Sequence, residues 1–138
     1  MMSGSVNRVI LIGNLGADPV LATRDDIDMR TASFPLATSE SWSDSGSGRR
    51  KQKREWHQVV CLDARVVRVV EHGCRKGAQV MIEGRLRTRE WTDEQGVRAK
   101  RTEIVIDGPG CDLRVLEPAR GGRPTRDRRR RRTPYADQ

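Results

Sequence analysis

The segment Gln79–Trp91 (QVMIEGRLRTREW) limits the possible folds most, because its side chains alternate in character along its length. Successive side chains of a β-strand point to opposite faces of the sheet. One face would carry Val80, Ile82, Gly84 and Leu86. The other face would carry Arg85, Arg87, Arg89 and Trp91. The pattern predicts a strand with one face on an apolar core and an opposite face of guanidinium groups that leads to an indole.

Further strands are indicated by short apolar runs that end at turn residues. They are Val6–Ile12, Ala32–Ser39, Glu55–Leu62, Val97–Ile106 and Cys111–Leu116. Pro35 removes a backbone donor from the second of these strands, so we expect a bulge or an edge position there. Ala64–Cys74 has valines at mixed spacing and is followed by Lys76 and Gly77, a typical helix end. This segment predicts one short helix.

Glycine, proline and polar residues predict turns at Gly13–Pro19, Asp93–Gly96 and Asp107–Gly110. Ser41–Gln52 (SWSDSGSGRRKQ) predicts a long polar loop. The resulting order is several strands, one helix and then more strands. This order matches an all-β fold, a five-stranded Greek-key OB-fold barrel with a short helix between its third and fourth strands.

The positive charge of the chain is concentrated near its carboxyl end. The whole chain has a net charge of +8, and residues 118–138 hold eight arginines and two aspartates, a net of +6. We therefore expect an OB-fold domain at residues 1–117 and a disordered arginine-rich tail at 118–138. The charge suggests a polyanionic partner such as nucleic acid, although solubility alone would also explain it.

The cysteines do not suggest a metal centre. They are Cys61, Cys74 and Cys111. Their odd number and the lack of C-x-x-C spacing are typical of reduced structural thiols. Only His57 and His72 could join them, and the spacing matches no zinc pattern, so we expect no metal and no cofactor.

The chain shows no sign of a membrane or secretory segment. It has no apolar run near the ~18 residues that a membrane helix needs. Its first residues, Met1–Asn7, lack the basic start and apolar core of a secretory signal. We expect no membrane partner and a cytoplasmic location.

The aromatic residues are unusual, because three tryptophans accompany one phenylalanine and one tyrosine. Core packing would explain any single tryptophan. Trp42, Trp56 and Trp91 all have basic residues nearby, which favours stacking on nucleic-acid bases, since every base has a π-face. The predicted strand at Glu55–Leu62 is partly apolar on both faces, so at least one face would meet something beyond the barrel core.

Basic residues cluster beside the first of these tryptophans. They are Arg49, Arg50, Lys51, Lys53 and Arg54. Such a cluster could act as a mobile basic flap that neutralises phosphates, or it could be the solvated tip of a hairpin.

These segments together resemble the bacterial single-stranded DNA-binding protein family. The matching segments, in family order, are VNRVILIGNLGADP at Val6–Pro19, LATSESWSD at Leu36–Asp44, EWHQVV at Glu55–Val60, RKGAQVMIEGRLRTREWTD at Arg75–Asp93 and TEIVI at Thr102–Ile106. The resemblance implies an OB fold, a homotetramer and sequence-nonspecific binding of single-stranded DNA in replication, repair and recombination. It also implies a cytoplasmic, nucleoid-associated protein.

The resemblance also implies roles for individual residues. Trp42, Trp56 and Trp91 match stacking tryptophans of the family. Arg87, Arg89 and Lys76 match basic residues on its DNA path. The subunit interface would include His57 and the N-terminal strand with Val6, Arg8 and Ile10.

Several positions depart from the family pattern. The family's stacking phenylalanine is Leu62 here, so we expect a weaker stacking platform. Glu90 replaces a lysine, and Asp63 and Ala64 stand where a basic residue is usual. The family's acidic C-terminal tip is replaced by Arg128–Arg132 and TPYADQ, so we do not expect recruitment of other proteins through such a tip. These departures suggest an accessory member.

Two other classes of function remain as alternatives. A nuclease would need a carboxylate cluster, a phosphate loop or a metal motif, and the sequence has none of these. We therefore expect no enzymatic activity. A protein-interaction adaptor of the replication machinery could keep the OB fold and bind nucleic acid weakly, but the three tryptophans argue against it.

Overall fold

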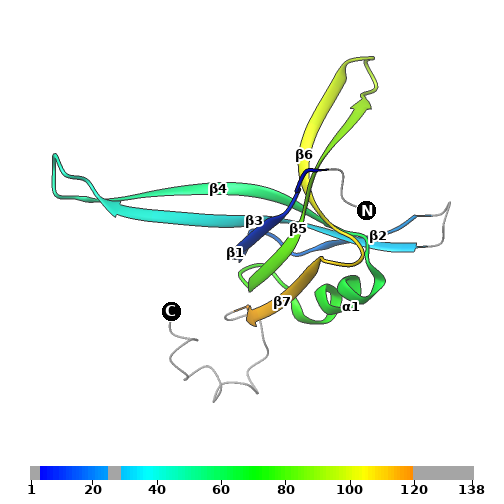
Figure 1. Cartoon of the computed structure of the whole chain (residues 1–138), viewed down its shortest axis with the longest axis horizontal. Helices are drawn as coiled ribbons and strands as arrows, with labels where there is room; N and C mark the ends of the chain where they lie inside the picture. The colour runs from blue at the N-terminus through cyan, green and yellow to red at the C-terminus, as the bar shows by residue number, and fades with distance from the viewer. Residues whose placement is uncertain (1–3, 25–28, 120–138) are drawn as a thin grey trace.

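The computed structural model describes residues 4–24 and 29–119, and its elements are shown in Figure 1. The strands and the helix are β1 (Val9–Leu15), β2 (Val20–Arg24), β3 (Met29–Ser43), β4 (Arg50–Cys61), α1 (Ala64–Gly73), β5 (Gln79–Thr92), β6 (Arg98–Ile106) and β7 (Asp112–Glu117). The arginine-rich tail that we expect to be disordered lies outside the described residues from residue 120 onward.

The strand pairings form a closed ring. β1 pairs with β3 at one end and with β5 along its length, β3 pairs with β4, and β5 pairs with β6. A parallel pairing between β4 and β6 closes the ring. β2 pairs with β3 and β7 with β5 outside this ring. The ring has five strands and α1 connects its third and fourth strands, which confirms the predicted all-β OB fold.

The inside of the ring is the hydrophobic core. Its fully buried residues include Ala32, Phe34 and Leu36 of β3, Val59 and Cys61 of β4, Val80 and Ile82 of β5 and Ile106 of β6. Val66, Val67 and Val70 of α1 join the same cluster. Each fully buried Val, Leu, Ile or Phe contributes roughly 1.5–3 kcal/mol. The core therefore fixes which face of each strand points outward.

The three cysteines are buried and free of disulfides, as expected for structural thiols. Burial disfavours the thiolate and raises the pKa of Cys61 to about 12. Burial likewise raises the pKa of Cys74 to about 11. Both thiols therefore stay protonated and act as small apolar core residues.

Helix α1 begins and ends as its sequence indicates. The Asp63 carboxylate accepts a hydrogen bond from the Arg65 backbone N–H at 2.9 Å, which satisfies one of the free donors at the helix start. Cys74 follows the last helical residue, and its N–H donates to the carbonyl of Val70. Gly77 then adopts a φ of +96°, which a residue with a side chain rarely does.

Three sequence expectations about the strands were wrong. The first strand runs two residues beyond the start of the predicted turn, to Leu15, and Val20–Arg24 forms a strand that was not predicted. Half of Ser41–Gln52 is strand, because β3 continues to Ser43 and β4 begins at Arg50, so the connection between them is shorter than predicted. Its pairing runs out to Ser43 and Arg50. Backbone hydrogen bonds hold these strand ends, and the sequence has no alternation of apolar residues there that would have indicated them.

Pro35 is neither at a bulge nor at an edge. The register between β3 and β4 continues through it, opposite Gln58. On its other side, β3 pairs with β2 up to Ser33 and with β1 from Leu36 onward. Pro35 lies where β3 changes neighbour, so the ladder on that side needs no donor from its nitrogen.

Two strand pairs extend beyond the ring as arms that point in different directions (Figure 1). The β3–β4 arm consists of residues 38–43 paired with residues 50–55. The β5–β6 arm consists of residues 87–92 paired with residues 98–103. Leu86 was expected in the core but is half exposed, because it lies at the rim where β5 leaves the ring for its arm. No helix in the described part of the chain is long and apolar enough to cross a membrane.

Candidate nucleic-acid interface

All three tryptophans are partly exposed to solvent. The exposed fractions are 44% for Trp42, 55% for Trp56 and 38% for Trp91. Trp42 lies on the β3–β4 arm, Trp91 lies near the end of the β5–β6 arm, and Trp56 lies on β4 where its arm joins the ring. Exposing an indole is unfavourable in water. The three positions therefore indicate a surface that another molecule covers.

Trp56 lies against the end of β1. A Cβ atom added to Gly16 would stand 2.4 Å from the Trp56 ring, so only a glycine allows this contact. The Arg54 guanidinium lies 5.9 Å from the ring centroid, within cation–π range. A groove of about 320 Å³ lies beside the Trp56 indole and is also lined by Asn14 and Lys76. An aromatic face and cationic groups thus lie around one hollow.

Trp91 has a basic residue stacked on it. The Arg89 guanidinium lies 4.7 Å from the centroid of the indole ring. The same guanidinium forms an ion pair with Glu103, with 3.1 Å between Nη2 and Oε2. Arg87 lies on the same face of β5, and in the described part of the chain it has no ion-pair partner. Arg87 is therefore the more available of the two for a phosphate.

The predicted basic flap is part of an ordered arm, and its residues divide between two faces. Lys51 and Lys53 lie opposite Trp42 and Glu40 and share their face. Arg50 and Arg54 share the other face with Trp56. Their strand partners there are Ser43 and Ser39. The structure thus brings Trp56 and the arginines together and separates them from Trp42 and the lysines.

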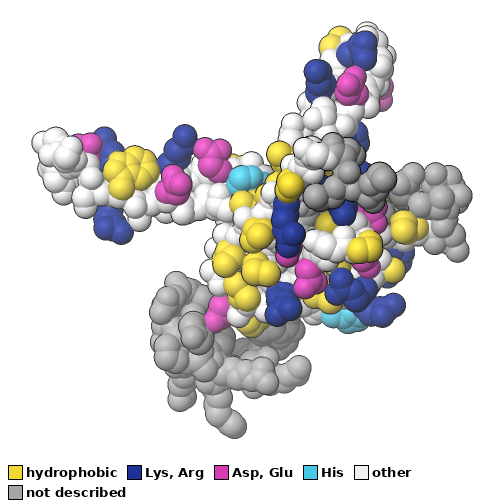
Figure 2. All heavy atoms as spheres, viewed as in Figure 1, with side chains coloured by type: hydrophobic (Ala, Val, Ile, Leu, Met, Phe, Trp, Pro, Cys, Tyr) yellow, Lys and Arg dark blue, Asp and Glu magenta, His cyan; other side chains and the backbone are white. Residues whose placement is uncertain are grey.

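Charges are distributed unequally between these two faces. The face with Trp42 also carries Glu40 and Glu55, and Lys53 forms an ion pair with Glu55 at 3.3 Å. The face with Trp56 carries arginines and neutral side chains, and Arg50 donates to Ser41 Oγ at 3.1 Å. Figure 2 shows both basic and acidic side chains along this arm. Arg49 is exposed in the turn at its tip.

Sequence reasoning missed several residues around the tryptophans. Gly16 was assigned only to a turn, and Asn14 and Glu103 were not singled out. A glutamate between strand residues gives no signal of its own, because its role depends on the partner strand. Leu62 follows β4 and is half buried, and its N–H donates to the carbonyl of Ile106 at 2.9 Å. It remains a predicted contact.

The outer face of β1 is apolar. Ile10 and Ile12 are exposed on it, and Val6, which was predicted to begin this strand, is exposed but precedes it. Figure 2 shows hydrophobic side chains gathered over β1 and the adjoining part of β5. Arg8 forms an ion pair with Glu83 at this face. His57 lies elsewhere on β4, is half buried and makes a 2.9 Å hydrogen bond with Thr38 Oγ1.

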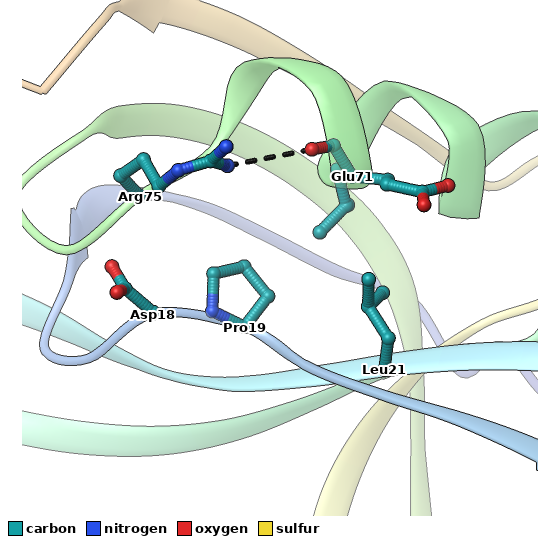
Figure 3. Close-up of a pocket in the computed structure, with 6 residues that line it drawn as sticks. Asp18, Pro19, Leu21, Glu71 and Arg75 are labelled. Carbon is teal, nitrogen blue, oxygen red and sulfur yellow. Dashed lines mark hydrogen bonds between the residues drawn. The ribbon is translucent and has the colours of Figure 1, made fainter. Parts of the chain in front are cut away.

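A second hollow of about 280 Å³ lies between α1 and the segment that leads into β2 (Figure 3). Asp18, Pro19 and Leu21 face Glu71 and Arg75 across it. The carboxylate of Glu71 is engaged by Arg30 at 2.9 and 3.0 Å. This pairing lowers the pKa of Glu71 and keeps it ionised. None of the described residues that line the hollow is aromatic, so it is not a candidate site for a base.

The five-stranded ring with one inserted helix, and with exposed indoles on its outer surface and arms, defines an OB-fold protein of the nucleic-acid-binding type. Residues 6–114 match the model of the "Single-strand binding protein family". The chain is 46% identical over 121 residues to a "Single-stranded DNA-binding protein" of Rhizobium meliloti (strain 1021), which covers 88% of this chain and 68% of the relative. The chain belongs to the single-strand binding protein family.

A solved structure supports the same assignment. It is described as "Plasmodium falciparum SSB complex with ssDNA" and superposes with a TM-score of 0.75 at 32% sequence identity. The match covers 85% of this chain and 100% of that chain.

Proposed function

We propose that this protein binds single-stranded DNA without sequence preference, by stacking bases on its tryptophans and pairing phosphates with its arginines and lysines. The observation that carries the proposal is the exposure of Trp42, Trp56 and Trp91 in a chain of this family. Stacking is possible for any base and needs an unpaired strand, so it selects single-stranded over duplex DNA.

The proposed contacts follow the positions of the basic side chains. Arg54 and Lys76 lie at the groove beside Trp56, and Arg87 leads toward Trp91 along β5. On the β3–β4 arm, phosphates would be neutralised by Arg49, Arg50, Lys51 and Lys53. Such binding would protect exposed strands during DNA replication, repair and recombination, in the cytoplasm and at the nucleoid. No chemical step is part of this function.

Titration of oligothymidylate and of a duplex of equal length against the protein tests this proposal. We expect strong binding of the single strand and much weaker binding of the duplex. Equal affinity for both, or no affinity for either, would contradict the proposal. Incubating the same oligonucleotide with Mg²⁺ and the protein should leave it intact, and cleavage would favour a nuclease instead.

We further propose that the protein is a homotetramer. Val6, Ile10 and Ile12 form an exposed apolar face that a second copy would cover. Arg8 directly precedes β1, and His57 would meet another subunit. Light scattering at micromolar concentration should give about four times the chain mass of 15.6 kDa. A monomer there would refute the assembly.

A further inference from the structure

Glu103 is the one buried charged residue in the described part of the chain. Its side chain keeps 7% of its surface exposed. A buried carboxylate is unfavourable unless a cation and hydrogen bonds compensate it. Arg89 provides both, because Nη2 donates to Oε2 at 3.1 Å and Nε donates to the same oxygen at 3.3 Å. Glu103 thus fixes the position of one guanidinium.

The fixed guanidinium lies on the exposed indole of Trp91, 4.7 Å from the ring centroid. Guanidinium groups are flat and stack on aromatic faces. Arg89 and Trp91 are two residues apart on β5, so they share a face. Glu103 lies on β6 opposite Arg87, diagonal to Arg89. One arginine therefore connects a buried carboxylate to a tryptophan that stays partly open to solvent.

We propose that Glu103 and Arg89 are positioning residues that hold Trp91 for stacking, and that Arg89 is not mainly a phosphate ligand. This inference rests on the proposed binding of single-stranded DNA. Arg89 covers part of the indole and restricts its motion, and the base stacks on the surface that remains. The ion pair is formally neutral, so it attracts phosphate weakly. Arg87, which has no carboxylate partner among the described residues, takes the phosphate contact on this arm.

The positioning role can be tested without DNA. The full chain is labelled with 5-fluorotryptophan, and the ¹⁹F resonance of Trp91 is assigned with Trp91→Phe. Glu103→Gln keeps the side-chain size but removes the charge, and Arg89→Lys keeps the charge but loses the flat fork. We expect both variants to shift the Trp91 resonance and leave that of Trp42 in place. Arg87→Gln is the matched control and should leave the Trp91 resonance in place.

An unmoved Trp91 resonance in the folded variants would overturn the proposal. Circular dichroism checks folding, and if Glu103→Gln does not fold, Arg89→Lys decides the question alone. A resonance that moves equally in Arg87→Gln would also overturn it, because the effect would then follow any loss of charge on the arm.

The salt dependence of oligothymidylate binding tests the assignment of the phosphate contact. Arg87→Gln should flatten the slope of log affinity against log salt by about 0.7, the value for one neutralised phosphate of a single strand. The double variant Arg89→Gln/Glu103→Gln should keep the wild-type slope and bind about tenfold more weakly at every salt concentration, within the cost of one stacked base. A double variant that flattens the slope as much as Arg87→Gln would show that Arg89 contacts phosphate.

The two proposals can fail separately. If the wild-type protein does not bind oligothymidylate, the proposed function fails. The fluorine measurement on the free protein then still decides whether Glu103 and Arg89 hold Trp91.

Discussion

At the residue scale, two of the three tryptophans of the candidate interface have a neighbouring residue that restricts the motion of the indole. Trp56 lies on Gly16, where any side chain would collide with the ring. Trp91 lies against Arg89. A ring that is held in place loses less conformational entropy when a base stacks on it. We infer that these supports contribute to affinity although they need not touch DNA.

Replacing either supported tryptophan should weaken binding without unfolding the barrel, because both rings lie outside the core cluster. Trp56→Ala and Trp91→Ala should each reduce the binding free energy by about 1–3 kcal/mol, the cost of one stacked base. Fluorescence anisotropy of labelled oligothymidylate measures the reduction, and circular dichroism checks the fold. Unchanged affinity in both folded variants would refute the stacking model.

Sequence reasoning identified the exposed residues of the site better than the buried ones. An indole beside arginines suggests stacking from its chemistry alone, so Trp42, Trp56 and Trp91 could be selected before any coordinates. The role of Glu103 depends on contact with Arg89 across two strands, and no local pattern contains that pairing. Gly16 could be assigned to a turn, but its closeness to Trp56 depends on how β1 and β4 meet.

At the element scale, the sequence predicted the strands whose side chains face the core, but it missed β2 and the outer part of the β3–β4 arm. β5 alternates between apolar and polar residues, which correctly indicated its core face up to Leu86 at the rim. The outer part of the β3–β4 arm contacts no core, and β2 has only five residues. β2 is held by backbone hydrogen bonds to β3, and the two strands of the arm are held by backbone hydrogen bonds to each other. Apolar periodicity does not reveal such pairing.

The two faces of the β3–β4 arm should contribute differently to phosphate binding. Glu40 and Glu55 offset the lysines on one face, whereas no carboxylate of the arm shares the other face with Arg50 and Arg54. We expect Arg50→Gln/Arg54→Gln to flatten the salt slope of oligothymidylate binding by about 0.7 for each phosphate that is no longer neutralised. Lys51→Gln/Lys53→Gln is the matched control with the same change in charge and should flatten it less. Equal slopes for the two double variants would refute this division.

At the scale of the whole molecule, a nearly balanced body is joined to a strongly basic segment. Residues 118–138 carry a net charge of +6 out of +8 for the chain. Arginine is always charged and pairs well with phosphate. We expect deletion of these residues to weaken binding at low salt and to flatten the salt slope by about 0.7 for each phosphate that the segment neutralises. An unchanged slope in the truncated protein would show that the segment does not bind DNA.

Direct contact between the exposed indoles and the bases of a single strand is the basis of the proposed interface, and tryptophan fluorescence reports that contact. Stacking on a base brings the ring against another π-system, so addition of oligothymidylate to the full-length protein should quench the intrinsic emission until the sites are filled. The chain has three tryptophans, all partly exposed, so a large fraction of the emission should disappear. Binding detected by anisotropy with no change in tryptophan emission would contradict stacking as the basis of this interface.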